Sequence, residues 1–132
     1  MLNLEIVTPE KSVFSDTVDS VSVPTVSGEI GILTNHAPLI SGLKSGVLSY
    51  SKNGATERMV VAGGFVEVSD NKVSILADTA ESVGDIDVEA ARVERETVER
   101  NLGAWKGTEE EFEIEREKLE RAQARLQLAS GK

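Results

Sequence analysis

The spacing of apolar residues changes once along this chain, near Asp85, and this change limits the fold more than any other feature. Before Asp85, apolar and polar residues alternate over short stretches that end at Gly, Pro, Asn or Asp. After it, apolar residues recur at heptad spacing among Glu, Arg and Ala. Alternation is typical of a half-buried strand, and heptad spacing of a helix with one apolar stripe. We therefore expect a β domain over residues 1–84 and a helical domain over residues 85–132.

The first part predicts many short strands joined by tight turns. Leu2, Leu4 and Ile6 alternate with polar residues at the start of the chain. Asn53–Gly54 is typical of a type I′ hairpin turn, and Asp70–Asn71 separates two further alternating runs. The other runs contain Val21 and Val23, Ile30 and Ile32, Leu48 and Tyr50, Met59 to Ala62, Val66 and Val68, and Val73, Ile75 and Ala77. Short strands with frequent turns predict a β-sandwich or a flattened barrel.

The second part predicts two helices joined by a short link, which makes them an antiparallel hairpin. Asp85 or Asp87 is expected to cap the first helix, which ends near Gly103. Thr108, with Glu111 three residues later, forms a capping box for the second. The predicted seam residues are Val88, Ala91, Val98, Leu102 and Trp105 in the first helix, and Phe112, Leu119, Ala122, Leu126 and Ala129 in the second.

The seam of this hairpin is small, and isolated helices of such length are only marginally stable in water. We therefore expect the hairpin to dock on the sandwich or to leave it for a partner. An element that can do both is a two-state element.

Composition excludes several classes of protein. The formal net charge of −9 argues against nucleic-acid binding, which requires a basic patch, and against broad adhesion to an anionic membrane. No apolar run approaches the roughly 20 residues that span a bilayer, and the N-terminal residues do not resemble a secretory signal. Without cysteine there is no disulfide and no thiolate metal site. The composition fits a cytoplasmic bacterial protein.

Residues suited to catalysis are scarce. His36 is the only histidine, so neither a metal set nor a nucleophile with its base can be assembled from the usual groups. No phosphate-binding P-loop is present, and Gly63–Gly64 is too short for a dinucleotide-binding fingerprint. We predict no catalytic residue and no metal site, and hence a binding, regulatory or structural protein.

Charge is graded along the second helix. Acidic residues crowd residues 109–115, and a helix dipole favours them there and favours cations toward the other end. A solvated face tuned to the dipole accounts for most of these charges. Arg121 and Arg125 differ, because like charges four residues apart repel on a bare helix and suggest an anion or an acidic partner. The cations of the later half are Arg116, Lys118, Arg121 and Arg125.

Four parts of the chain together resemble the epsilon subunit of F-type ATP synthases. They are LEIVTPEKSVF, SGEIGILTNHAPLISGLKSGVL, VAGGFVEVSDNKVSILADTAE, and DIDVEAA with ERAQARL. The resemblance covers nearly the whole chain. It implies an α+β fold, in which an antiparallel β-sandwich of about ten short strands precedes an antiparallel two-helix hairpin. Periodicity alone does not count the strands.

The resemblance also implies partners and a role. In this family the sandwich lies at the foot of the central stalk, against the gamma subunit and the c-ring. The hairpin either packs on the sandwich or extends along gamma into the alpha/beta catalytic head, where it hinders ATP hydrolysis. The protein is then a non-catalytic rotor subunit, held peripherally on the cytoplasmic side of the bacterial plasma (inner) membrane.

Two sets of contact residues follow from the resemblance. Glu29 and His36, in the stretch GEIGILTNHAPLI, are expected to face the c-ring and the base of gamma. The alternative is that both are turn residues with satisfied side chains. The residues expected to contact the catalytic head in the inhibitory state are Arg116, Lys118, Arg121 and Arg125.

The resemblance also raises the possibility of a regulatory ATP site, and ATP is the one cofactor that it suggests. Nucleotide-binding members of the family resemble Ile-Asp-x-x-Arg-Ala at the start of the first helix. Here Ala90 replaces the arginine, and Arg92 lies about 200° around the helix from it, so ATP binding is expected to be weak or absent. Ile86 and Asp87 alternatively just begin a helix. The matching residues are Glu81, Ile86, Asp87, Ala91, Arg121 and Arg125.

Three functions remain open at this point. The first is a rotor subunit that couples the c-ring to gamma and restrains hydrolysis. The second is a nucleotide-sensing module in which ATP holds the hairpin down. The third is a free-standing adaptor with a borrowed fold.

Overall fold

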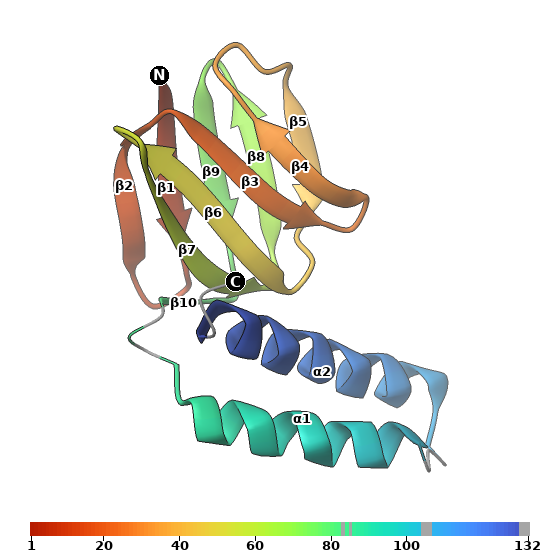
Figure 1. Ribbon diagram of the computed structural model, residues 1–132. Coiled ribbons are helices and arrows are strands. Elements are labelled where there is room, and N and C mark those ends of the chain that lie inside the picture. Colours follow the sequence, from red (N-terminus) through yellow and green to blue (C-terminus); the bar gives the residue numbers. More distant parts are fainter. Residues whose placement is uncertain (83, 85, 104–106, 130–132) are drawn as a thin grey trace.

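A computed structural model of the chain describes residues 1–82, 84, 86–103 and 107–129. Over these residues ten strands precede two helices (Figure 1). Asp85, one of the two expected caps, and Trp105, an expected seam residue, lie outside the described residues. The elements are β1 (Leu2–Val7), β2 (Ser12–Val18), β3 (Ser20–Thr25), β4 (Gly28–Ile32), β5 (Leu39–Gly42), β6 (Gly46–Lys52), β7 (Ala55–Ala62), β8 (Phe65–Ser69), β9 (Lys72–Leu76), β10 (Thr79–Ser82), α1 (Val88–Gly103) and α2 (Glu109–Ala129).

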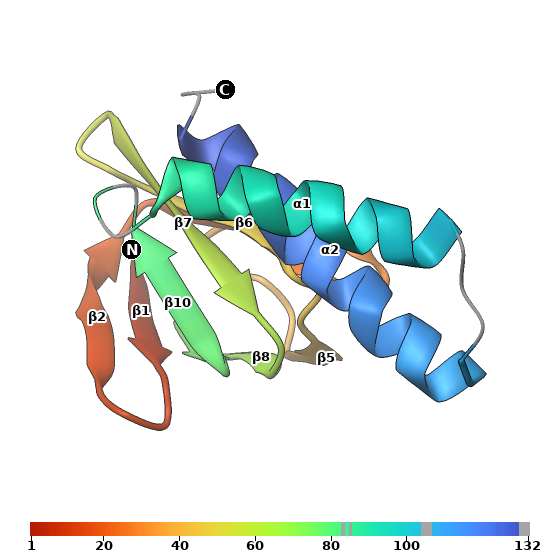
Figure 2. The ribbon, with the colours of Figure 1, turned by 90° about the horizontal axis from the view of Figure 1, so that it is seen from below.

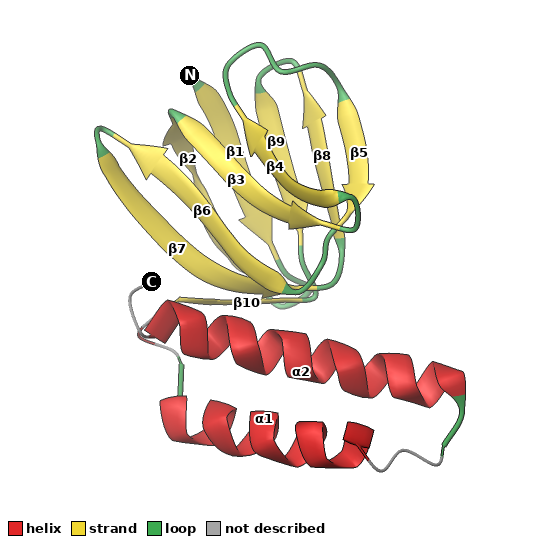
Figure 3. Cartoon of the chain, turned by 45° about the vertical axis from the view of Figure 1, so that its right-hand side comes forward, coloured by secondary structure: helices red, strands yellow, loops and turns green. Residues whose placement is uncertain are grey.

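The strands form two sheets that face each other as a sandwich (Figure 3). The first sheet has the order β2-β1-β9-β8-β5, and the second has the order β10-β7-β6-β3-β4. Among the described strands, β1 and β9 pair in parallel and the other neighbours pair antiparallel. The predicted fold class, a β-sandwich followed by an antiparallel helical hairpin, is confirmed.

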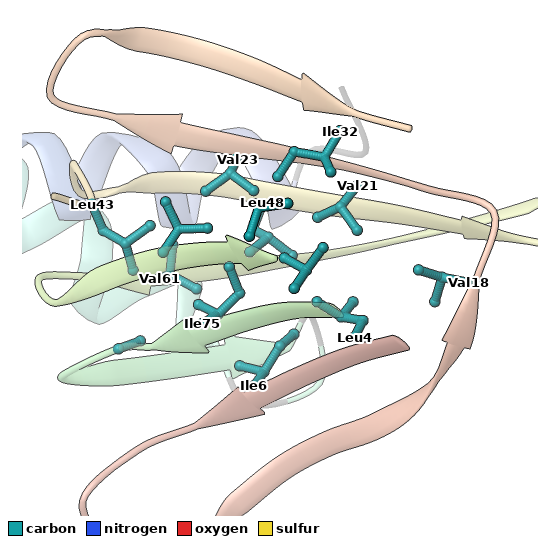
Figure 4. Close-up of a cluster of buried hydrophobic side chains, with 14 of the residues drawn as sticks. Leu4, Ile6, Val18, Val21, Val23, Ile32, Leu43, Leu48, Val61 and Ile75 are labelled. Carbon is teal, nitrogen blue, oxygen red and sulfur yellow. The ribbon is translucent and has the colours of Figure 1, made fainter. Parts of the chain in front are cut away.

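The hydrophobic core fills the space between the two sheets (Figure 4). Leu4 and Ile6 of β1 and Ile75 of β9 belong to the same cluster as Val23 of β3 and Leu48 of β6. Each of these five residues is at most 1% exposed. They are members of the alternating runs that predict the strands, because inward and outward side chains alternate along a strand.

Two of the hairpin turns follow directly from the sequence. Asn53 and Gly54, between β6 and β7, have φ angles of 52° and 81°. Asp70 and Asn71, between β8 and β9, have φ angles of 49° and 60°. Positive φ at both central positions defines a type I′ turn, as predicted for Asn53–Gly54.

Three strands that the alternation does not reveal, β2, β5 and β10, lie at sheet edges. An edge strand borders solvent, so polar residues are tolerated at its inward positions. In β2, Phe14 packs on Tyr50 with ring centroids 4.5 Å apart, whereas Asp16 pairs with Lys52. The hydrogen bond from Lys52 lowers the pKa of Asp16. These polar residues interrupt the apolar pattern and conceal the strand.

Gly63 and Gly64 carry the chain from β7 in the second sheet to β8 in the first. Their φ angles are 68° and 97°, a region that side chains rarely adopt. A Cβ atom on Gly64 would lie 1.8 Å from the carbonyl oxygen of Leu76. The glycine pair therefore allows the chain to pass from one sheet to the other in a tight turn, close to the backbone of Leu76.

Helix α2 lies between α1 and the sandwich (Figures 1 and 3). Ala124 and Leu128 pack against Val60 of β7, and Val47 and Ile86 border this contact. We call these five residues the docking patch. Seen from below, α2 crosses β6 and β7 while α1 lies on its outer side (Figure 2).

Both helices begin with the expected type of cap. The Ala90 N–H donates to Asp87 Oδ1 at 3.0 Å, and the Glu111 N–H donates to Thr108 Oγ1 at 3.1 Å. Each bond satisfies a backbone donor that the first helical turn leaves open. Of the two caps considered for α1, Asp87 fills this position.

The helix seam matches the prediction only in part. Ala91, Val98 and Ala122 are buried as expected, but Val88 is 49% exposed because it begins α1. The heptad pattern also predicts a single apolar stripe on α2, and this prediction is wrong. Ala124 and Leu128 form a second apolar face, because α2 packs against α1 and against the sandwich at once.

We predict that Ile75→Ala destabilises the sandwich by about 2–5 kcal/mol, the range for truncating a fully buried isoleucine. Ile75 is 0% exposed, whereas its neighbour Leu76 is 49% exposed. Leu76→Ala is therefore the matched control, with an expected cost below about 1 kcal/mol. The measurement is the free energy of unfolding in urea. Equal losses for the two variants would contradict the assignment of the core.

Candidate functional site

The described residues hold no cluster of three or more His, Asp or Glu side chains placed to bind a metal ion. No helix among them is long and apolar enough to cross a membrane. Two groups of residues are candidate sites: the exposed loop around His36 and a cluster of charged side chains on β10, α1 and α2.

The first candidate is the loop between β4 and β5, which contains His36. The Asn35 N–H donates to Asn71 Oδ1 at 2.6 Å, and Asn71 Nδ2 donates to Asn35 Oδ1 at 3.3 Å. These bonds tie the loop to the β8–β9 turn. His36 Nδ1–H donates to the Ala37 carbonyl at 2.7 Å, because a carbonyl oxygen can only accept. The loop is thus held in one shape, and His36 is partly buried in it.

Glu29 lies elsewhere, on the outer face of the second sheet. It is the second residue of β4 and pairs in register with Pro24. Ser22 Oγ–H donates to Glu29 Oε1 at 2.5 Å, and the carboxylate is exposed. Glu29 thus lies near the start of β4, whereas His36 follows the other end of the strand.

Sequence reasoning missed two apolar side chains that flank the His36 loop. Leu33 is 65% exposed and Ile40 is 73% exposed. Leu33 is the first residue of the loop and Ile40 is the second residue of β5, but a sequence does not say which leucines or isoleucines remain uncovered. Both side chains are accessible to a partner that contacts the loop.

The second candidate is a charge cluster that joins three elements, and we call it the arginine cluster. It consists of Glu81 of β10, Glu94 of α1, and Arg121 and Arg125 of α2. Arg125 Nε donates to Glu81 Oε1 at 2.9 Å, and a second nitrogen of the same guanidinium also binds Glu81. Arg125 Nη1 lies 3.5 Å from Glu94 Oε2, and Arg121 Nη2 lies 3.6 Å from Glu94 Oε1. These side chains are 21–30% exposed.

The structure brings together only half of the residues expected at an ATP site. Glu81, Arg121 and Arg125 meet in the arginine cluster. Asp87 caps α1, and Ala91 is buried. Ile86 belongs to the docking patch. Asp87 therefore has the helix-starting role considered as the alternative, whereas Ile86 has a packing role.

Glu94 is the cluster member that sequence reasoning missed. It stands immediately before the heptad seam position held by Arg95. Charged residues beside the seam positions commonly pair with the facing helix, so this place in the heptad is the signal that could have revealed it. Glu94 also borders a groove of about 800 Å³ between the helices, which Ala90 and Arg121 line as well.

The other two cations of α2 pair within their own helix. Arg116 Nη2 donates to Glu113 Oε2 at 2.5 Å, and Lys118 Nζ donates to Glu115 Oε1 at 3.0 Å. The hydrogen bond to Glu113 raises the pKa of Arg116. Both cations remain exposed at the surface. All four cations expected at the catalytic head thus have carboxylate partners inside the chain.

The first half of α2 stands off the sandwich. A groove of about 430 Å³ separates the two and is lined by Val26 and Leu43 on one side and by Ile114 on the other. Lys44 Nζ of the sandwich reaches across to Glu120 Oε1 at 3.8 Å. Helix α2 is therefore anchored mainly through its later turns, by the docking patch and the arginine cluster.

Comparison with known sequences agrees with this architecture. Residues 1–83 match the family model of the ATP synthase delta/epsilon chain, beta-sandwich domain. The ATP synthase epsilon chain of Nitratidesulfovibrio vulgaris is 46% identical over 130 residues, covering 97% of this chain and 90% of the relative. That of Anaeromyxobacter sp. (strain K) is 43% identical, covering 97% of each chain. That of Desulfitobacterium hafniense (strain Y51) is 48% identical over 104 residues, covering 79% of each chain.

Solved structures share the fold at low sequence identity. A chain of the Euglena gracilis mitochondrial ATP synthase superimposes with a TM-score of 0.83 at 23% identity, covering 98% of this chain and 81% of that one. A chain of the Tetrahymena thermophila mitochondrial ATP synthase superimposes with a TM-score of 0.67 at 16% identity, covering 98% and 94%. The resemblance to the epsilon subunit is confirmed, and the chain belongs to the ATP synthase epsilon chain family.

Proposed function

We propose that this protein works in the central stalk of an F-type ATP synthase, where its sandwich joins the gamma subunit to the c-ring and its hairpin restrains ATP hydrolysis. The observation that carries this proposal is the unequal anchoring of the two parts. The sandwich has a complete core of its own, whereas the hairpin is held by one small apolar patch and a few ion pairs. In this role the protein carries no catalytic residue itself.

The partners are proposed from the relatives. The Euglena structure contains the F1 head and the c-ring, and the Tetrahymena structure is of the central stalk and c-ring. We infer the same surroundings here: gamma, the c-ring and the alpha/beta head. The protein is then peripheral, on the cytoplasmic side of the bacterial plasma membrane.

The His36 loop is the proposed contact with the c-ring and the base of gamma, and Glu29 extends this contact along β4. Support comes from the hydrogen bonds that fix the loop and from the exposed Leu33 and Ile40 beside it. A rigid loop loses little conformational entropy on binding, which favours a lasting contact.

The cations of α2 are the proposed contacts with the catalytic head. Arg116 and Lys118 are exposed, and their pairs within the helix contribute little stability. Both can therefore exchange their partners for acidic groups of the head at small cost. Arg125 loses Glu81 of β10 only when the hairpin leaves the sandwich, whereas Arg121 is released only if α1 and α2 also separate, because its partner Glu94 lies on α1.

The first prediction concerns assembly. A chain ending at residue 84 should fold and bind gamma, because the buried core residues of the sandwich come from its strands and their loops. Co-purification with gamma, alongside the full chain, is the measurement. A folded truncated chain that fails to bind gamma would place the interface in the hairpin. Failure of the full chain to bind gamma would favour a free-standing adaptor.

The second prediction concerns inhibition. Removal of residues 87–132 should raise ATP hydrolysis by the assembled complex severalfold while assembly is retained. Arg116→Glu combined with Lys118→Glu should reproduce part of this increase, most clearly at low ionic strength, where surface charges are least screened. Arg100→Glu, a charge reversal on α1, is the control and should have little effect. Unchanged hydrolysis after the truncation would reduce the hairpin to a structural strut.

The third prediction concerns ATP as a regulatory ligand. ATP binding to the natural chain should be weak or absent, and Ala90→Arg should strengthen it by about ten- to a hundredfold, the value of one charged hydrogen bond. Ala90 is exposed and lines the same groove as Arg121, so an arginine there has room. Thr97→Arg, farther along that groove, is the matched control. Titration calorimetry with ATP is the measurement. A gain in affinity for Ala90→Arg but not for Thr97→Arg supports the prediction, and tight binding by the natural chain contradicts it.

A further inference from the structure

The paired arginines of α2 raise a question that the sequence leaves open, namely what supplies their counter-charge. Arg121 and Arg125 are one helical turn apart, so their charges repel on a bare helix. Two carboxylates of the same chain face them, Glu81 from β10 and Glu94 from α1. The four side chains together have no formal net charge.

The two carboxylates are not equally engaged. Arg125 binds Glu81 through two nitrogens, including the 2.9 Å bond from Nε. Glu94 lies at 3.5 Å from Arg125 and at 3.6 Å from Arg121. The strong contact therefore joins α2 to the sandwich, and the longer ones join α2 to α1.

The apolar part of the docking contact is small. Among the described residues, Val60, Ala124 and Leu128 are the ones buried there, and two of the three have short side chains. Lys44 adds one long ion pair at 3.8 Å, with its own side chain 54% exposed. Beside so small an apolar contact, the ion pair between Glu81 and Arg125 is expected to contribute a large share of the docking free energy.

We propose that Glu81 and Arg125 form a latch that holds the hairpin on the sandwich with charges supplied by the chain alone. The two carboxylates balance the charge of the arginine pair, so the docked state requires no bound anion for charge neutrality, although Arg121 Nε and Glu94 Oε1 are buried there without a hydrogen-bond partner among the described residues. Ionic strength then acts as a modest release signal, because the two side chains are only 21% and 22% exposed and partly buried pairs are screened less than surface pairs. The use of this release to restrain hydrolysis rests on the proposed function, whereas the latch itself does not.

Amide hydrogen exchange of α2 in the isolated full-length protein tests the latch. An undocked helix is only marginally stable, so its amides exchange in proportion to the free population. Glu81→Gln should raise exchange over residues 121–129 about tenfold, equivalent to roughly 1.4 kcal/mol. Added salt, at about 0.5 M, should raise exchange of the natural chain and have less effect on the variant.

Two controls make the test specific. Glu67→Gln removes one exposed carboxylate from β8 of the first sheet, so it reports the effect of net charge alone and should leave exchange unchanged. Inorganic phosphate, compared at equal ionic strength, should not slow exchange of the natural chain. Equal effects of Glu81→Gln and Glu67→Gln, or strong protection by phosphate, would overturn the latch. Because no other subunit is present, either result leaves the proposed role in the ATP synthase to be judged by the truncation experiment.

Discussion

The closed core between the two sheets is the constraint on which the rest of this structure depends. Leu4, Ile6 and Ile75 from one sheet meet Val23 and Leu48 from the other. The described residues of this core all come from the sandwich, and none comes from either helix. The described core residues of the sandwich therefore come from its strands and loops, and the hairpin packs on the outside of this core.

The position of α2 follows from what the sandwich leaves uncovered. Val60 of β7 and Val47 of β6 point outward from the second sheet, and Ala124 and Leu128 cover them. Helix α1 packs against α2, which lies between it and the sheet (Figure 3). Among the described residues, the main contacts of the hairpin with the sandwich come from the later turns of α2.

Ion pairs of α2 also contribute to this attachment. Arg125 of α2 pairs with Glu81 on the sandwich and with Glu94 on α1, so this one side chain links α2 to both of its neighbours. Arg116 and Lys118 instead form pairs within one helix and remain at the surface. The same basic stretch therefore contains two kinds of cation, those that hold the hairpin and those that are accessible to another molecule.

The sequence by itself determined the local features of this protein. Alternation at Leu2, Leu4 and Ile6, positive φ at Asn53–Gly54, and capping by Asp87 and Thr108 depend on neighbours a few residues away. Only the tertiary structure decided the rest: the edge strands β2, β5 and β10, the second apolar face of α2, and the pairing of Glu94 with Arg121 and Arg125. These depend on which surfaces meet, and partners such as Glu81 and Arg125, 44 residues apart, become neighbours only when the chain has folded.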